Sequence, residues 1–138
     1  MKKRTLAREF ALQILYQIDI CHEGCEEVLK KFWQAKADEE IEEEVKLFSA
    51  DLVKGTVDNL AAIDEKITQF ATNWQLERMA FVDRNILRLG VFELAFRPDI
   101  PPKVTINEAV ELAKKFSGKE AGKFVNGILD KIKIEIKK

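Results

Sequence analysis

The sequence predicts an all-α protein, a compact bundle of about six to seven helices. Apolar residues recur at spacings of three and four along most of the 138-residue chain, and the alternation typical of strands is nearly absent. All three prolines fall within residues 98–102, so the other segments lack the residue that most strongly breaks helices. Hydrophobic residues make up 46% of the chain, which is enough for one domain with a buried core.

The first helix is expected from Thr5 to Ile20 and the second from Glu26 to Ala37, with Gly24 separating them. Each helix has one apolar face. The first face comprises Ala7, Phe10, Ala11, Ile14, Leu15 and Ile18, and the second comprises Val28, Leu29, Phe32 and Trp33. Because such stripes bury one side of a helix, both helices are expected to line the core.

A long third helix is predicted from Ile41 to Phe70, with Gly55 as the position at which it bends. The acidic run at residues 38–44 is interpreted as a loop and a solvated first turn, because acidic side chains favour helix N-termini. A short turn is expected over residues 74–78.

A central helix is predicted from Ala80 to Phe96, and its apolar residues nearly surround it, which is typical of a helix inside a bundle. The segment RPDIPP ends this helix, because proline disfavours helical backbone in the preceding residue. Thr105-Ile106-Asn107-Glu108 and Ser117-Gly118-Lys119-Glu120 have the pattern of capping boxes. The last two helices are therefore expected to begin at these two boxes.

Charge is balanced overall, with 23 basic and 24 acidic residues, but it is unevenly distributed. Residues 1–10 and 119–138 are basic, whereas residues 38–51 carry seven acidic side chains against one lysine. Such a chain can present a basic surface without being a basic protein. No apolar run reaches the length of a membrane span, and no signal-peptide core follows the basic start, so we expect a cytoplasmic protein that does not enter membranes.

Metal binding is disfavoured, and no cofactor is expected. Cys21, His22 and Cys25 lie together in CHEGC, but a structural zinc site needs four ligands and the sequence has no second cluster. The two cysteines are therefore expected to be reduced thiols at a helix end.

The sequence also lacks the patterns of an enzyme, since it contains neither a phosphate-binding loop nor GxGxxG. Asp83 and Glu93 lie in the central helix close to Arg84 and Arg88, and we interpret both acids as ion-pair or capping partners at a helix junction. Catalysis is therefore disfavoured.

The last helix contains KFVNGILDKI, residues 123–132, with two unusual features. Gly127 lies mid-helix, where glycine costs up to about 1 kcal/mol relative to alanine. Lys123 and Phe124 place a cation beside a ring, and a stacked RNA base with its phosphate would suit such a surface. Alternatively, Phe124 belongs to the core and Gly127 admits a neighbouring helix. The residues alone leave both interpretations open, and they do the same for Tyr16, which is either a stacking residue or the edge of the core.

Four segments resemble the NusB family of transcription antitermination factors. They are AREFAxxxLY at residues 7–16, VDRNILRLGVFEL at 82–94, IPPKVTINEAVELAKKF at 100–116 and GKFVNGILDKI at 122–132. The resemblance extends over the whole chain. A related domain precedes methyltransferase domains that modify ribosomal RNA, but this chain has no room for one, so it resembles the free-standing factor.

The resemblance implies an all-α fold of two small helical subdomains, at about residues 1–72 and 73–138, with the first three helices in the first. It implies binding of boxA, a single-stranded RNA signal in ribosomal RNA operon leaders, together with NusE, a small-subunit ribosomal protein. The pair would join RNA polymerase with NusA and NusG, without enzymatic activity. Some members of the family form homodimers that hide the RNA surface, and others are monomers.

The resemblance also implies roles for particular residues. The RNA-binding positions fall on Lys2, Lys3, Arg4, Arg8, Tyr16, Glu120, Lys123 and Phe124. The first four form a basic amino-terminal arm, which is expected to come round to meet Lys123 and Phe124. Asp83 falls on the surface that binds the ribosomal protein. Some relatives have a run of arginines where this chain has Arg4-Thr5-Leu6-Ala7-Arg8, so weaker RNA affinity without NusE is expected. The alternative function is a helical protein-interaction scaffold that binds no RNA.

Overall fold

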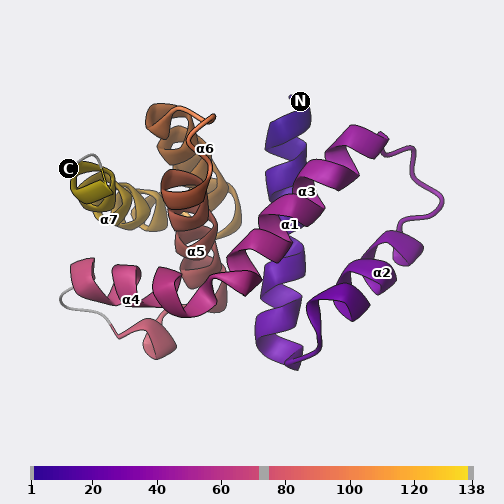
Figure 1. The fold of residues 1–138 in the computed structure, drawn as a ribbon, viewed down its shortest axis with the longest axis horizontal. Helices are drawn as coiled ribbons and strands as arrows, with labels where there is room; N and C mark the ends of the chain where they lie inside the picture. Colours follow the sequence, from indigo (N-terminus) through magenta and orange to yellow (C-terminus); the bar gives the residue numbers. More distant parts are fainter. Residues whose placement is uncertain (1, 72–74, 137–138) are drawn as a thin grey trace.

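The computed structural model describes residues 2–71 and 75–136, and these two ranges are helical apart from short connections. They contain seven α-helices and no strand, which confirms the predicted all-α class (Figure 1). The helices are α1 (Lys3–Cys21), α2 (Cys25–Ala35), α3 (Glu43–Asp58), α4 (Leu60–Phe70), α5 (Phe81–Phe96), α6 (Pro102–Phe116) and α7 (Lys119–Ile136). A 3-10 turn, η1, spans Leu76–Arg78 and forms part of the expected turn, whose first residue, Trp74, lies outside the described residues. None of the described helices is long and apolar enough to cross a lipid bilayer.

Helix α5 lies at the centre of the bundle, as its apolar surface predicts. It packs against α1, α3, α4, α6 and α7, and every residue from Asn85 to Leu94 is buried. In Figure 1, α1, α2 and α3 lie on one side of α5, and α6 and α7 lie on the other. One continuous apolar core extends from Ala11 in α1 to Ile132 in α7, so the two groups of helices share a single core.

The predicted third helix is in fact two helices, and the prediction of one continuous element was wrong. The chain turns at Asn59 rather than at Gly55, and the Asn59 side-chain amide donates a hydrogen bond of 2.8 Å to the Gly55 carbonyl. Asparagine favours such a break because its side chain competes for backbone hydrogen bonds. The turn sends α4 against α5 and α7. The subdivision at residue 72 stays a prediction.

Gly55 lies inside α3 and has a packing role instead of bending the helix. A Cβ atom at this position would lie 2.1 Å from Cζ of Phe92, a buried residue of α5. Because no real Cβ contact is that short, only glycine allows the Phe92 ring to lie against the α3 backbone. Gly55 therefore determines how closely α3 approaches α5.

The first predicted capping box is wrong as a helix start, whereas α7 begins at Lys119, within the second. Helix α6 begins at Pro102, where proline is favoured because it lacks the N–H that a first helical residue leaves unpaired. Thr105 is buried one turn inside α6 and donates from Oγ1 to Glu93, 2.8 Å away. Ser117 is the C-cap of α6, and Gly118 then adopts a φ of 120° before α7 begins.

A buried polar cluster joins α1, α4 and α5. Asp19 of α1 accepts hydrogen bonds of 2.7 Å from both Nε and Nη2 of Arg84, and Arg88 pairs with Asp64 of α4 at 2.8 and 2.9 Å. Burial alone would raise the pKa of Asp19, but the hydrogen bonds from Arg84 and Asn85 and the nearby guanidinium charges lower it. The two arginines thus pair with α1 and α4 rather than with Asp83 and Glu93. Glu93 does form an ion pair at a helix junction, as predicted, but its partner is Arg8 of α1.

We expect Gly55→Ala to destabilise the protein by about 1–3 kcal/mol, because the added methyl group forces Phe92 out of its packed position. Thermal or urea unfolding monitored by circular dichroism measures this change. Gly127→Ala is the matched control, since nothing lies within 4 Å of a Cβ at that helical position. The control should raise the free energy of unfolding by about 0.5–1 kcal/mol. Equal effects of the two substitutions would contradict the packing role of Gly55.

Candidate nucleic-acid interface

Side chains of α1 and α6 meet along a seam beside the amino-terminal half of α1. At one end, Thr5 Oγ1 donates to Glu108, 2.5 Å away, and further along Lys115 Nζ donates to both carboxylate oxygens of Glu9 at 3.0 Å. Phe116, the last residue of α6, reaches a groove that Leu12 also lines. Helix α6 therefore follows α1 from its amino-terminal end toward Tyr16.

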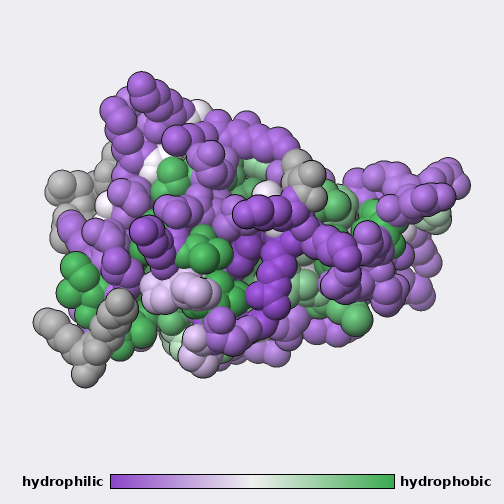
Figure 2. Space-filling model, turned by 90° about the horizontal axis from the view of Figure 1, so that it is seen from above, coloured by the Kyte–Doolittle hydropathy of each residue, from purple (hydrophilic) through white to green (hydrophobic). Residues whose placement is uncertain are grey.

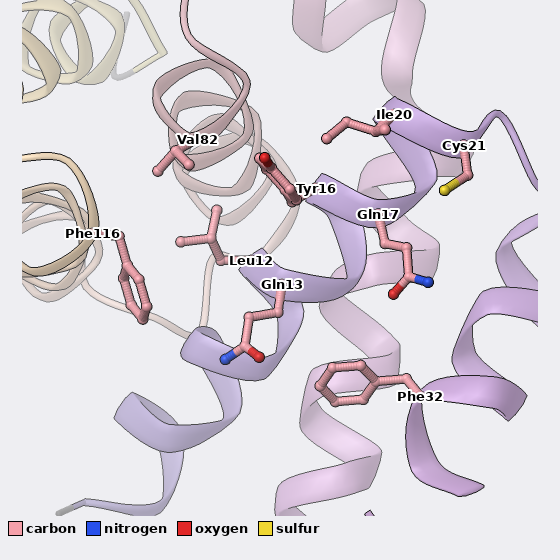
Figure 3. Close-up of a pocket in the computed structure, with 9 residues that line it drawn as sticks. All are labelled: Leu12, Gln13, Tyr16, Gln17, Ile20, Cys21, Phe32, Val82 and Phe116. Atoms are coloured by element: carbon pink, nitrogen blue, oxygen red, sulfur yellow. The ribbon is translucent and has the colours of Figure 1, made fainter. Parts of the chain in front are cut away.

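The seam ends in a shallow apolar groove of about 500 Å³ (Figure 3). It is lined by Leu12, Gln13, Tyr16, Gln17, Ile20, Cys21, Phe32, Val82 and Phe116. Tyr16 is 39% exposed, and its ring meets that of Phe81 edge-on at a centroid distance of 6.2 Å. Tyr16 is thus accessible from the groove while one edge packs on the protein, so its ring is available for stacking.

A second hollow, of about 690 Å³, lies between the start of α5 and the first turns of α7. It brings together the predicted residues Asp83, Glu120, Lys123 and Phe124. The two hollows are neighbours, because they are lined by consecutive residues: Val82 and Phe116 in the groove, Asp83 and Ser117 in the hollow. Five of the nine predicted site residues therefore lie around two adjoining hollows.

The sequence left two interpretations of Phe124 and Gly127 open, an RNA surface and the packed core, and the structure has features of both. Phe124 is half-buried: it packs against the core and also lines the second hollow. Gly127 is exposed, and nothing lies within 4 Å of a Cβ built there, so the interpretation that it admits a neighbouring helix was wrong. The close approach occurs at Gly122, where a Cβ would lie 3.0 Å from Cγ of Lys114. Gly127 instead leaves helix backbone open on the surface beside Lys123.

The charged residues of the second hollow differ in their surroundings. The Lys123 side chain is 68% exposed and its ammonium lies 3.6 Å from the Glu120 carboxylate, so this pair is accessible to an anion. Asp83 is half-buried, and its Oδ1 atom is shielded from solvent without a hydrogen-bond partner among the described residues. Of the two roles predicted for Asp83, the ion pair is therefore wrong, and the residue lies in the first turn of α5 without a side-chain cap hydrogen bond at its N-cap.

The amino-terminal basic residues do not form a flexible arm that reaches Phe124, which corrects a second prediction. Helix α1 begins at Lys3, so Lys3 and Arg4 form its first turn, about 20 Å along the helix from Tyr16. Lys3 pairs with Glu44 and, at 2.9 Å, with Glu42, and these acids raise its pKa. The exposed Arg4 guanidinium lies 4.3 Å from the Phe48 ring centroid. The basic end is thus held in place at the opposite end of the seam.

Arg8 is unavailable to RNA in this structure, so we no longer count it among the predicted RNA-binding residues. It is 3% exposed and donates from Nε and Nη2 to Glu93 at 2.8 and 2.9 Å, while Nη1 donates to Glu108 at 3.0 Å. Glu93 is only 2% exposed and accepts from Thr105 as well. A charge that is buried and fully paired serves the fold, because freeing it would leave Glu93 uncompensated.

Sequence reasoning missed Lys115 and Phe116. Phe116 is 40% exposed in the groove, and the Lys115 ammonium, half-exposed, lies 5.5 Å from its ring centroid. These two residues repeat the Lys-Phe dipeptide of residues 123–124, which was the available signal. Lys115 places a positive charge along the seam, between the Glu9 carboxylate and the Phe116 ring of the groove.

The acidic segment between α2 and α3 projects away from these hollows. In Figure 2 this part of the molecule extends to the right and is largely hydrophilic, in keeping with the predicted solvated face. Cys21 is exposed and Cys25 half-buried, and both are free thiols. Within the described ranges, no group of three or more His, Cys, Asp and Glu side chains is placed to hold a metal ion.

Comparison with known proteins agrees with the resemblance in sequence. The sequence model of the NusB family matches residues 5–133. The chain belongs to the NusB family. The transcription antitermination protein NusB of Anaeromyxobacter dehalogenans strain 2CP-1 is 53% identical over 130 residues, covering 94% of this chain and 89% of the relative. This family comprises antitermination factors rather than enzymes, which confirms the non-enzymatic prediction.

Two solved structures show the same NusB fold. The chain is 35% identical to NusB of T. maritima, with a TM-score of 0.85 and coverage of 98% of this chain and 92% of the other. It is 32% identical to a chain in a crystal structure of the antitermination factors NusB and NusE in complex with double-stranded RNA, with a TM-score of 0.88 and 98% of both chains covered. In that structure, the NusB fold occurs together with NusE and RNA.

We expect Arg8→Ala to lower the free energy of unfolding by about 3–5 kcal/mol, because it leaves the Glu93 carboxylate buried without its main partner. Urea unfolding of Arg8→Ala, Glu93→Ala and the double variant measures this loss. The double variant should lose less than the sum of the two single losses, because neither charge then remains unpaired. A fully stable Arg8→Ala protein would contradict the buried pair.

Proposed function

We propose that this NusB-family protein binds boxA RNA of ribosomal RNA operon leaders together with NusE, and so supports processive transcription by RNA polymerase with NusA and NusG in the cytoplasm. The observation that carries the proposal is the junction of the two hollows, with Tyr16 in one and Lys123 and Phe124 in the other. Accessible rings beside a cation match the way proteins hold single-stranded RNA, by stacking bases and pairing phosphates.

Phosphate contacts are proposed along a line rather than at one point. Lys2, Lys3 and Arg4 provide positive charge at one end of the seam, Lys115 further along it, and Lys123 beyond it in the second hollow. Glu120 moderates this charge, because its carboxylate competes with phosphate for Lys123. Lys3 and Lys115 are likewise paired with acids, so we expect modest RNA affinity for the isolated protein and a large gain with NusE.

The ribosomal-protein surface is proposed to include the region of Asp83. This residue opens α5 at the rim of the second hollow, and its shielded Oδ1 atom lacks a hydrogen-bond donor among the described residues. The structural similarity to a NusB chain solved with NusE and RNA supports a joint surface. RNA on the Phe124 side and the partner on the Asp83 side would then share one hollow.

A helical scaffold that binds no RNA is the alternative. The apolar lining of the groove, with Ile20, Phe116 and Tyr16 each about 40% exposed, also suits a protein surface or a second copy of the chain. Fluorescence anisotropy with boxA RNA, with and without NusE, distinguishes the two functions. Binding of NusE without any RNA binding would favour the scaffold.

We expect Phe124→Ala to weaken RNA binding by about 1–3 kcal/mol, the contribution of one base–aromatic stack. Replacing a core phenylalanine by alanine typically lowers the free energy of unfolding by about 3–5 kcal/mol. Because Phe124 is only half-buried, we expect a smaller loss here. Anisotropy titration together with a thermal melt separates the two effects. Phe96→Ala, at an exposed ring lining neither hollow, is the control and should leave RNA binding unchanged. Unfolding of Phe124→Ala at low temperature would show that the residue is core.

Asp83→Lys should weaken NusE binding while leaving the weak RNA binding of the isolated protein nearly intact. The physical reason is charge reversal at the proposed partner surface, on the α5 side of the hollow, whereas Lys123 and Phe124 line it from α7. Isothermal titration calorimetry with NusE measures the loss, and Asp83→Asn serves as the isosteric control, with a smaller loss expected. NusE affinity equal to that of the wild type in Asp83→Lys would exclude Asp83 from this surface.

Removal of residues 1–4 should flatten the salt dependence of boxA binding and weaken it for all RNA sequences alike. Each phosphate contact on a single strand adds about 0.7 to the slope of log affinity against log salt. Lys115→Ala and Lys123→Ala should each flatten the slope by a smaller step, whereas Lys54→Ala should not. Lys54 is a suitable control because it is half-exposed and paired with a glutamate, as Lys115 is. A slope unchanged by truncation would show that the amino-terminal charges are merely solvated.

A further inference from the structure

Two glutamine side chains line one wall of the groove. Gln13 and Gln17 lie four residues apart on α1, so they occupy one face of the helix. Both side chains are half-buried, and neither makes a hydrogen bond with another described residue. Figure 3 shows that they leave α1 on the side of Phe32, whereas Leu12 and Tyr16 leave it on the side of Val82. Neither amide is among the solvent-shielded side-chain atoms without a partner, so both are reachable from the groove and free to hydrogen-bond to a ligand there.

We propose that this groove holds one unpaired RNA base, whose edge is read by Gln13 and Gln17. The inference rests on the proposed function and adds a specificity-determining pair of residues to it. Each amide offers an acceptor and two donors, which complements the adjacent donors and acceptors on the edge of a base. The groove also supplies what a base face requires, because Tyr16 and Phe116 present accessible rings in an otherwise apolar lining.

The surroundings of the groove favour a nucleotide over other occupants. Lys115 lies beside Phe116 with its ammonium 5.5 Å from the ring centroid, where it can hold the phosphate of the bound nucleotide. On its other side, Val82 and Phe116 of the groove are followed in the chain by Asp83 and Ser117 of the second hollow, so a strand that leaves the groove passes close to Lys123 and Phe124. A purely apolar partner would leave both amides unpaired.

The test combines changes in the protein with changes in the RNA. Wild-type protein with NusE is titrated with boxA RNA and with a series of boxA RNAs that each carry one abasic residue. Loss of the base that occupies the groove should weaken binding about 5- to 150-fold, the range that a bidentate base contact provides. In the Gln13→Leu/Gln17→Leu variant, intact RNA should bind more weakly, and the abasic penalty at that one position should nearly disappear.

Several controls make the outcome decisive. Gln69→Leu, at an exposed glutamine of α4 that lines neither hollow, should leave every abasic penalty unchanged. If the double leucine variant fails to fold in a thermal melt, Gln13→Asn/Gln17→Asn replaces it, since shortened amides remain polar but withdraw from the base. Abasic penalties that are identical in wild type and variant would overturn the inference. The same holds if sedimentation shows that the variants change only self-association.

Failure of the proposed function gives a different result. In that case, wild-type protein with NusE would bind intact boxA RNA no better than an unrelated RNA, and Phe124→Ala would change nothing. A second outcome is that boxA binding and its loss in Phe124→Ala are both observed, but the abasic penalties are the same with and without the Gln13 and Gln17 substitutions. In that case only the base-reading role is wrong.

Discussion

The buried ion pair between Arg8 and Glu93 is the interaction on which the rest of the architecture depends. It joins α1 to the central helix α5, and through Thr105 and Glu108 it extends to α6. Two charges placed in a core remain there only if nearly every donor and acceptor is satisfied, so the three helices have a narrow choice of relative positions. This constraint sets the position of α6 beside α1, and therefore creates the seam.

The seam explains how residues that are far apart in the sequence form one surface. Because α6 ends at Phe116 and α7 begins two residues after Ser117, the groove and the second hollow lie next to each other. The rings of Tyr16, Phe116 and Phe124 are consequently distributed over adjoining hollows, with ammonium groups beside two of them. Such spacing suits a flexible strand that places successive bases in successive sites.

Most of the basic side chains near the proposed RNA surface already pair with acidic side chains of the same chain. The cations at Lys3, Lys115 and Lys123 each have a carboxylate within 4 Å, and Arg8 is wholly internal. A phosphate must therefore compete with an existing partner, and exposed ion pairs are weak enough to allow this. In the proposed function, the positive charge of the surface would guide RNA along the seam, while stacking and hydrogen bonding would supply most of the discrimination.

The sequence by itself determined the helical class, the central position of α5 and the family, because apolar periodicity and extended motifs are local properties of the chain. It also indicated Tyr16, Lys123 and Phe124, whose residue types suit RNA wherever they are exposed. Only the tertiary structure decided that Arg8 is internal, that the chain turns at Asn59, and that Thr105 serves a buried network instead of a helix start. Exposure and pairing depend on which distant side chain arrives at a given position, as Glu93 does at Arg8, and local spacing carries no information about that partner.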